Sequence, residues 1–154
     1  MQLTIFTDIA LKSIMYLKQS QDLVTINEIA DKYLVPRNHL VKVLNFMVRK
    51  KWIGSVRGRY GGLFYIQTSD ELKLGEVIKT LENREELLNC EDCMINNSCH
   101  LRGLLSRAVD AFYVYLNQYT LADLNNSKTA NFINMGVLTQ PLKSVKSWNH
   151  NPAI

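Results

Sequence analysis

The sequence has no long run of apolar residues. Nowhere in its 154 residues is there a stretch approaching the roughly 18 consecutive apolar residues that a membrane-spanning helix needs. Residues 1–8 also lack the basic segment and the apolar core of a signal peptide. We therefore expect a cytoplasmic protein, in a compartment where free thiols and thiolate-bound metals persist and disulfides are rare.

Side-chain combinations that carry out catalysis are missing as well. We find no paired carboxylates, no nucleophile with a neighbouring base and no glycine-rich phosphate loop, so we do not expect an enzyme. The overall composition, 47% hydrophobic and 21% charged, is ordinary for a globular protein. The net charge of +4 is compatible with a nucleic-acid partner, and the position of the positive charges says more than their sum.

Cysteine is scarce, but all of it lies in one short segment. Cys90, Cys93 and Cys99 are the three cysteines of the chain. An odd number argues against a simple disulfide framework, whereas clustered soft thiolates favour zinc, copper(I) or iron–sulfur iron. The spacing alone leaves zinc, an iron–sulfur cluster and a redox disulfide open. Three thiolates also leave a tetrahedral zinc or a four-iron cluster one ligand short.

A first amphipathic helix is expected near the N-terminus. Apolar residues at helical spacing predict it from Thr7 to about Gln19, with Thr7 or Asp8 as the N-cap. Its buried face would consist of Ile9, Ala10, Ile14 and Leu17. On this pattern alone, Asp8 is explained as the helix cap or as the i, i+4 ion-pair partner of Lys12.

Residues 25–50 have the pattern of two helices joined by a tight turn. Thr25-Ile-Asn-Glu28 is a capping-box sequence that opens a short helix to about Tyr33. Val35-Pro36 breaks that helix and suits the start of a second one, which runs to about Lys50. The second helix has an apolar face made of Leu40, Val43, Leu44 and Met47. Together the two helices indicate a helix-turn-helix motif.

The polar face of the second helix and the segment after it would bind DNA. Two β-rich runs, 52–56 and 63–66, flank a glycine-rich tip and predict a hairpin that serves as a wing. Basic side chains there would neutralise phosphates, whereas Arg37, Asn38 and His39 could reach base edges in the major groove. The predicted DNA-binding residues are Arg37, Asn38, His39, Lys42, Asn45, Arg49, Arg57, Arg59 and Tyr60.

The rest of the chain predicts a short helix and a long one. The short helix runs from about Lys73 to Leu81, and after the cysteines a long helix runs from about His100 to Leu124. Apolar residues of the long helix step by four and three, as in a heptad seam, and a single small domain can hardly cover them. We therefore expect a homodimer with the dimerisation residues Leu101, Leu105, Ala108, Phe112, Tyr115 and Tyr119.

Four stretches, together with the three cysteines, resemble a known family of regulators. They are residues 7–11 (TDIAL), 36–43 (PRNHLVKV), 56–62 (VRGRYGG) and 119–124 (YTLADL). The chain resembles the dimeric winged-helix repressors that carry an iron–sulfur cluster, most closely the nitric-oxide-sensing NsrR group and less closely the IscR group. The resemblance covers about residues 1–125.

This resemblance implies an iron–sulfur cluster held by Cys90, Cys93 and Cys99. It also implies that the remaining ligand is an N-terminal aspartate from the partner subunit, which in this sequence matches Asp8. By analogy with the NsrR group we expect a 4Fe–4S cluster. A 2Fe–2S cluster is the alternative, because Cys90 and Cys93 are closer together than is usual in the family.

The sequence thus predicts a mainly α protein with a small β-hairpin wing. Residues 1–82 would form a winged helix-turn-helix domain, 83–99 a cysteine-rich cluster-binding loop, 100–125 a dimerisation helix and 126–154 an irregular tail. The expected function is a homodimeric repressor that releases a palindromic operator when nitric oxide modifies its cluster. The alternatives are a thiol- or zinc-based redox-responsive DNA-binding regulator without a cluster, and a small electron-transfer or cluster-carrier protein.

Overall fold

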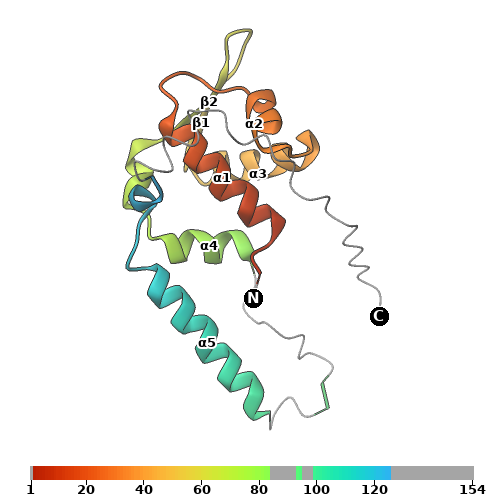
Figure 1. Ribbon diagram of the computed structural model, residues 1–154, viewed down its shortest axis with the longest axis vertical. Coiled ribbons are helices and arrows are strands. Elements are labelled where there is room, and N and C mark those ends of the chain that lie inside the picture. The colour runs from red at the N-terminus through yellow and green to blue at the C-terminus, as the bar shows by residue number, and fades with distance from the viewer. Residues whose placement is uncertain (1, 84–92, 95–98, 126–154) are drawn as a thin grey trace.

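The computed structural model describes residues 2–83, 93–94 and 99–125 of the chain (Figure 1). Most of the predicted cysteine loop and the whole predicted tail therefore lie outside the described residues. The fold is mostly helical with one two-stranded antiparallel hairpin, as the sequence predicts. Its elements, in chain order, are α1 (Ile5–Gln19), α2 (Ile26–Tyr33), α3 (Arg37–Arg49), β1 (Ile53–Val56), β2 (Gly62–Tyr65), η1 (Gln67–Glu71), α4 (Leu74–Glu82), α5 (His100–Leu116) and η3 (Leu121–Leu124).

Helix α1 begins two residues earlier than the sequence pattern predicted. Its N-cap is Thr4, whose hydroxyl oxygen accepts a hydrogen bond from the Thr7 N–H at 3.2 Å, so the assignment of Thr7 or Asp8 as the cap is wrong. Thr7 is instead fully buried in the first turn. The predicted buried face is confirmed, since Ile9, Ala10, Ile14 and Leu17 are all buried.

The helix-turn-helix has the predicted form. Thr25 and Glu28 make the reciprocal capping box that starts α2. The helix ends where Leu34 adopts the left-handed conformation, with φ of 52° and ψ of 41°, and Pro36 then precedes α3. All four predicted apolar residues of α3 are buried, namely Leu40, Val43, Leu44 and Met47. One face of α3 is thereby fixed against the core, and the other is left to solvent.

The hairpin β1–β2 is attached to the body at its base. Ile53 pairs with Tyr65 and Val56 with Gly62, while Trp52 and Ile53 are buried in the main core. Val24, between α1 and α2, forms two backbone hydrogen bonds with Leu63 of β2, at 2.8 and 2.9 Å. The wing is thus held by both the core and the segment that leads into α2.

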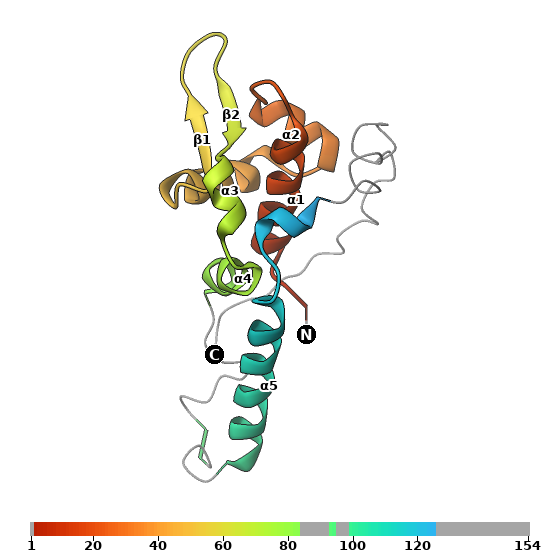
Figure 2. The ribbon, with the colours of Figure 1, turned by 90° about the vertical axis from the view of Figure 1, so that its left-hand side faces the viewer.

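Helix α5 extends away from the rest of the molecule (Figure 1), and in the perpendicular view it lies at the end opposite the hairpin (Figure 2). Contact with the body comes from its C-terminal half, where Val109 and Tyr113 pack with Ile78 of α4. The sequence predicted a helix to about Leu124, but α5 ends at Leu116. The Asn117 side chain accepts a hydrogen bond from the Glu76 N–H at 3.0 Å, which ties this helix end to the first turn of α4.

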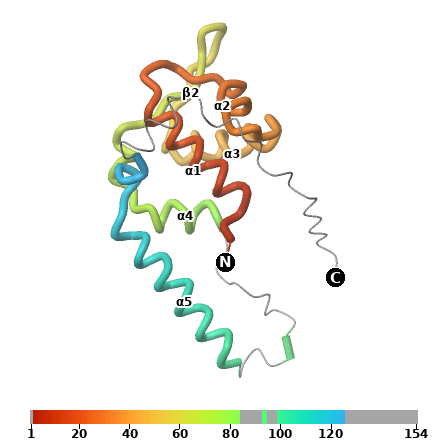
Figure 3. The backbone as a smooth tube through the Cα atoms, viewed as in Figure 1, coloured from red at the N-terminus to blue at the C-terminus, as the bar shows by residue number. Residues whose placement is uncertain are grey.

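From the C-terminal end of α5 the chain continues along the body (Figure 3). Thr120 and Asp123 form a capping box around the short helix η3, and Leu121 is completely buried. The Lys18 ammonium donates to the Leu121 carbonyl oxygen at 2.9 Å and also pairs with Asp70. Tyr65 donates to Asp70 at 2.9 Å, and its burial together with that bond raises the tyrosine pKa. Helix η3 is therefore held by both apolar and polar contacts.

Candidate nucleic-acid interface and cluster-ligand residues

The predicted DNA-binding residues of α3 are all on its solvent side. Every one of the six is exposed, whereas the apolar residues Leu40, Val43, Leu44 and Met47 between them are buried. The exposed set consists of Arg37, Asn38, His39, Lys42, Asn45 and Arg49. Because the buried face fixes the rotation of the helix about its axis, this polar stripe must face outward. A major groove could accept such a face, and base contact stays a prediction for these residues.

The tip of the wing presents the other three predicted DNA-binding residues. Arg57, Arg59 and Tyr60 are all exposed, Tyr60 to 85%. Gly58 has a φ of 119°, a backbone conformation that other residues rarely adopt, and its carbonyl accepts the Gly61 N–H at 3.0 Å. The Arg59 guanidinium lies 5.7 Å from the centroid of the Tyr60 ring, so the two side chains form a cation–π pair at the exposed tip.

Replacing Arg59 with alanine is expected to weaken binding to duplex DNA by roughly tenfold or more. One well-placed arginine contact to DNA contributes about 1–3 kcal/mol, and the exposed Arg59 side chain has no buried role in the fold that its loss would disturb. Fluorescence anisotropy at physiological salt would measure the change. The control is Arg107→Ala, because Arg107 is an exposed arginine on α5. Equal affinity of the Arg59 variant and the control would remove the wing from the interface.

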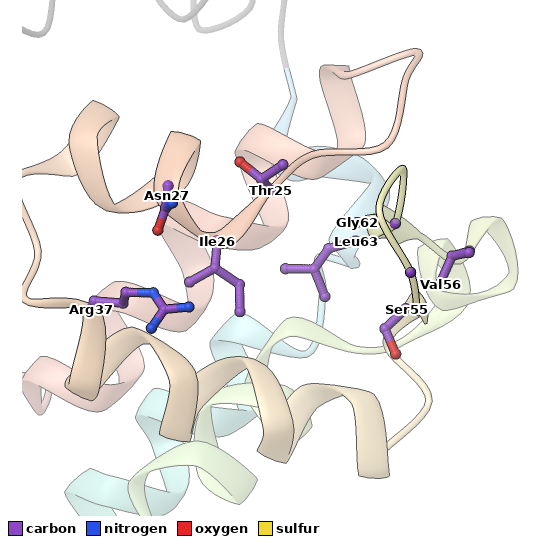
Figure 4. A pocket seen from close by; sticks show the side chains of 10 residues that line it. Thr25, Ile26, Asn27, Arg37, Ser55, Val56, Gly62 and Leu63 are labelled. Carbon is purple, nitrogen blue, oxygen red and sulfur yellow. The ribbon is translucent and has the colours of Figure 1, made fainter.

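A cleft of about 380 Å³ lies between the two parts of this surface (Figure 4). Its walls come from the start of α2, the start of α3 and both strands of the wing. Arg37 is the charged residue among those that line it, and Thr25, Asn27 and Ser55 add polar groups. The last three were not predicted from the sequence, because the cleft brings together segments about thirty residues apart.

Asp8 lies on the surface of α1 with its carboxylate half exposed. Its Oδ2 is 2.6 Å from Lys12 Nζ, so the structure confirms the i, i+4 ion pair that the sequence offered as one explanation. Exposed pairs of this kind contribute about 1 kcal/mol or less. The carboxylate is therefore held only weakly in place and can be drawn to a stronger partner.

The cysteines are described only in part. Cys93 is exposed and Cys99 half-buried, both with free thiols, whereas Cys90 lies outside the described residues. Cys99 is the N-cap of α5, and that end of α5 lies far from α1 in both views (Figures 1 and 2). Among the described residues, no three histidine, cysteine, aspartate or glutamate side chains come together as a metal site. One protomer thus keeps Asp8 apart from Cys99.

Two sets of contacts connect α1 with the elements on either side of it. Glu82, at the end of α4, accepts hydrogen bonds from the Thr4 N–H at 2.8 Å and from the Thr4 hydroxyl at 2.9 Å. The Phe6 ring lies edge-on to Phe46 of α3 at 5.5 Å, and Phe46 contacts Trp52 in the same way at 6.0 Å. Helix α1 is therefore in direct contact with both α3 and α4, the last helix before the cysteines.

The predicted dimerisation residues differ in how far they are covered. Leu101, Ala108, Tyr115 and Tyr119 are exposed, while Leu105 is half-buried. Phe112 packs partly against the α4–α5 cluster of its own chain, and Tyr119 lies beyond the end of the helix, with its ring edge-on to Tyr115 at 5.9 Å. Most residues of the seam are therefore exposed in the single chain, and their role in dimerisation stays a prediction.

Crossing a bilayer would require a long apolar helix, and none occurs within residues 2–83, 93–94 and 99–125. Comparison with protein families gives a match over residues 3–127 to the family described as "Rrf2: Iron-dependent Transcriptional regulator". The match therefore covers the helix-turn-helix, the wing, the cysteine segment and α5.

Solved structures share the fold at low sequence identity. CymR of B. subtilis, the global cysteine regulator, has 20% identity and a TM-score of 0.61, covering 82% of this chain and 99% of its own. The oxidized form of Staphylococcus aureus CymR has 22% identity and a TM-score of 0.64, covering 80% and 95%. IscR of T. potens has 17% identity and a TM-score of 0.63, covering 80% and 85%. At these identities the likeness shows the fold alone.

Proposed function

The chain belongs to the Rrf2 family of transcriptional regulators, and from this premise we propose that it is a homodimeric repressor controlled by an iron–sulfur cluster. In this proposal Cys90, Cys93 and Cys99 bind the cluster together with Asp8 of the partner subunit. Helix α3 would be the recognition helix. The two α3 helices of one dimer would then bind the half-sites of a palindromic operator, about 34–36 Å apart or a multiple of that distance.

The observation that carries the proposal is the separation of Asp8 from the start of α5. Within one chain α1 lies on the body, whereas Cys99 stands at the distant end of a projecting helix (Figure 1). A ligand set that includes both residues therefore requires two subunits. The exposed apolar seam of α5 offers a surface on which such a pair could form. The Asp8 carboxylate is accessible, because Thr4 rather than Asp8 caps the helix.

The donor types fit an iron–sulfur cluster. Soft thiolates are the usual ligands of such clusters, and both described cysteines are free and reach solvent. The carboxylate would be the weakest of the four ligands, since Lys12 offers it an alternative partner at 2.6 Å. When bound, the cluster would supply iron that can react with nitric oxide.

The chain's own residues supply the link from this site to DNA. Once Asp8 is released, its carboxylate can return to Lys12, and α1 is no longer held to the partner subunit. Because Phe6 of α1 lies against Phe46 of α3, a displacement of α1 is transmitted to the recognition helix. Loss of the fixed distance between the two recognition helices would lower operator affinity, so the bound and released forms are two states of one dimer.

Replacing Asp8 with alanine is expected to alter the response to nitric oxide while leaving the fold intact. Anaerobically purified protein should show an iron–sulfur absorbance, and the Asp8→Ala variant should lose it at a lower ratio of nitric oxide to protein. Lys12→Ala is the matched control, because it removes the same ion pair but keeps the carboxylate. Absorbance titration and gel shift measure both. An Asp8→Ala response identical to that of the parent would exclude the ligand role.

A thiol-based regulator without a cluster is the second candidate. It is favoured by the exposed, free thiol of Cys93 and by the likeness in fold to CymR, which is known in an oxidized form. Iron and sulfide analysis of anaerobic protein separates the two candidates. Absence of both elements, together with DNA binding that changes on thiol oxidation, would favour the second.

A further inference from the structure

We propose that the cleft between α2 and the wing is a binding site for the DNA backbone, with Arg37 as its phosphate ligand. The inference rests on the DNA binding of the family and goes beyond it. The sequence pattern placed Arg37 among residues that read base edges, and it did not assign Thr25, Asn27 or Ser55 to DNA at all. The proposal gives these four residues one shared role that does not depend on the DNA sequence.

The position of the cleft follows from the two elements on either side of it. Helix α3 presents its polar side chains on one side, and the wing tip presents Arg57 and Arg59 on the other. In a duplex, a major groove and the adjacent minor groove are separated by a single sugar–phosphate strand. If α3 enters the first groove and the wing tip the second, that strand must pass between them. The cleft occupies this place.

The lining of the cleft matches the chemistry of that strand. Ile26 and Leu63 form an apolar floor, which suits the carbon atoms of deoxyribose, while the Arg37 side chain extends from α3 toward Ile26 (Figure 4). Among the described residues Arg37 has no ion-pair partner, and Asn27 and Ser55 are exposed. A guanidinium that is free of other partners can donate to two phosphate oxygens at once.

The base of the cleft is fixed by hydrogen bonds. Backbone hydrogen bonds between Val24 and Leu63 fasten the wing to the segment that leads into α2. A Cβ added at Gly62 would lie 2.9 Å from Leu23 Cβ and 3.0 Å from the Val24 carbonyl oxygen, so the two segments are already in close contact. A preformed cleft requires little ordering when the DNA arrives, which favours binding.

Two substitutions test this role by salt dependence. Each phosphate that a protein neutralises contributes about 0.9 to the slope of log K against log salt, so Arg37→Ala should reduce the slope by about 0.9 per subunit. Asn27→Asp places a like charge beside the phosphate and should weaken binding at low salt by about tenfold or more. Because an acidic residue in a first helical turn is favourable, Asn27→Asp should leave α2 intact.

The measurement uses the full-length protein and duplexes of about 30 base pairs, with unrelated sequences and with single base-pair changes in one of them, titrated by anisotropy between about 50 and 200 mM salt. Controls are Arg107→Ala and Gln118→Glu, which make the same charge changes at exposed positions near or on α5. Both controls should keep the parental slope. Circular dichroism checks that each variant is folded.

The outcomes separate the cleft from the rest of the function. A smaller slope for Arg37→Ala and weaker binding of Asn27→Asp, on unrelated sequences alike, support the proposal. Unchanged binding of both variants overturns it. An Arg37→Ala variant that keeps its slope but loses preference for one base pair also overturns it and assigns Arg37 to base reading. If the parent protein itself binds no duplex, the DNA-binding function fails first and the cleft with it.

Discussion

Replacing Leu121 with alanine is expected to lower the free energy of unfolding by about 2–5 kcal/mol. The Leu121 side chain has no exposed area and belongs to the main core, although it follows α5 in the sequence. The Leu121 N–H donates to the Leu72 carbonyl oxygen at 3.0 Å, and the Lys18 ammonium donates to the Leu121 carbonyl oxygen. Truncation would leave a cavity beneath the point where the chain returns from α5, and the surrounding backbone is too well bonded to collapse into it.

Urea denaturation followed by circular dichroism would measure this loss. Leu121→Met serves as the control, because a volume-conserving replacement usually costs less than about 1.5 kcal/mol. The loss of DNA binding should likewise be larger for Leu121→Ala than for Leu121→Met. If η3 loosens, α5 loses one of its attachments to the body, and binding to a palindromic duplex should weaken more than binding to arbitrary DNA. A loss below about 1 kcal/mol for Leu121→Ala would mean that η3 is a surface segment.

The elements that the sequence predicted well are those defined by short-range patterns. The capping box at Thr25, the break at Val35-Pro36 and the apolar spacing of α3 each act within one or two helical turns, and the structure confirms them. The wing could be predicted equally well from the sequence, because two β-rich runs flank the glycines at its tip. In these regions local preference and tertiary packing favour the same conformation.

The end of α5 could have been placed correctly from a signal that the heptad seam obscured. Tyr119 continues the apolar spacing, and this favoured one unbroken helix to about Leu124. Thr120-Leu-Ala-Asp123 is, however, a capping-box sequence, and the structure uses it to start η3. A similar local signal, a threonine at position 4, marks the true start of α1. In both cases a threonine that caps the helix marks where the helix begins.

The residues of the candidate sites could be predicted from the sequence, but their arrangement in space could not. Arg37 and the wing arginines could be named, but the cleft between them depends on the hydrogen bonds of Val24 with Leu63, which join segments about forty residues apart. Similarly, the sequence could pair Asp8 with the cysteines only through a family resemblance. The separation of Asp8 from the start of α5 is a property of the three-dimensional arrangement, and it is what makes a second subunit necessary in the proposal.

Replacing Gly75 with alanine is expected to disrupt the junction of α4 and α5. A Cβ at Gly75 would lie 2.5 Å from both the Tyr113 carbonyl oxygen and the Asn117 side-chain oxygen. The first of these is backbone of α5 and cannot rotate away, so the two helices must move apart. Overpacking of this kind costs about 1–3 kcal/mol, and here it also breaks the hydrogen bond of Asn117 to the Glu76 N–H.

The Gly75→Ala substitution should weaken operator recognition by more than its loss of stability alone would explain. In the proposed dimer, α5 carries the seam between the subunits, so a change in its angle to α4 alters the distance between the two recognition helices. Affinity for a palindromic duplex, selected from a random library, should fall by about tenfold or more, while affinity for arbitrary DNA should change little, because phosphate contacts of one subunit do not depend on that distance.

Gly103→Ala is the matched control, since Gly103 lies within α5 and, within the part of the chain that the structure describes, a Cβ there meets only Arg107 Nη1, at 3.7 Å. Alanine in a helix interior is favoured over glycine by about 0.5–1 kcal/mol, so this variant should be slightly more stable than the parent. Thermal unfolding and anisotropy on both duplexes measure the two variants side by side. If Gly75→Ala binds the palindrome as tightly as Gly103→Ala does, the α4–α5 junction does not set the spacing of the recognition helices, and the dimer must be organised by other contacts.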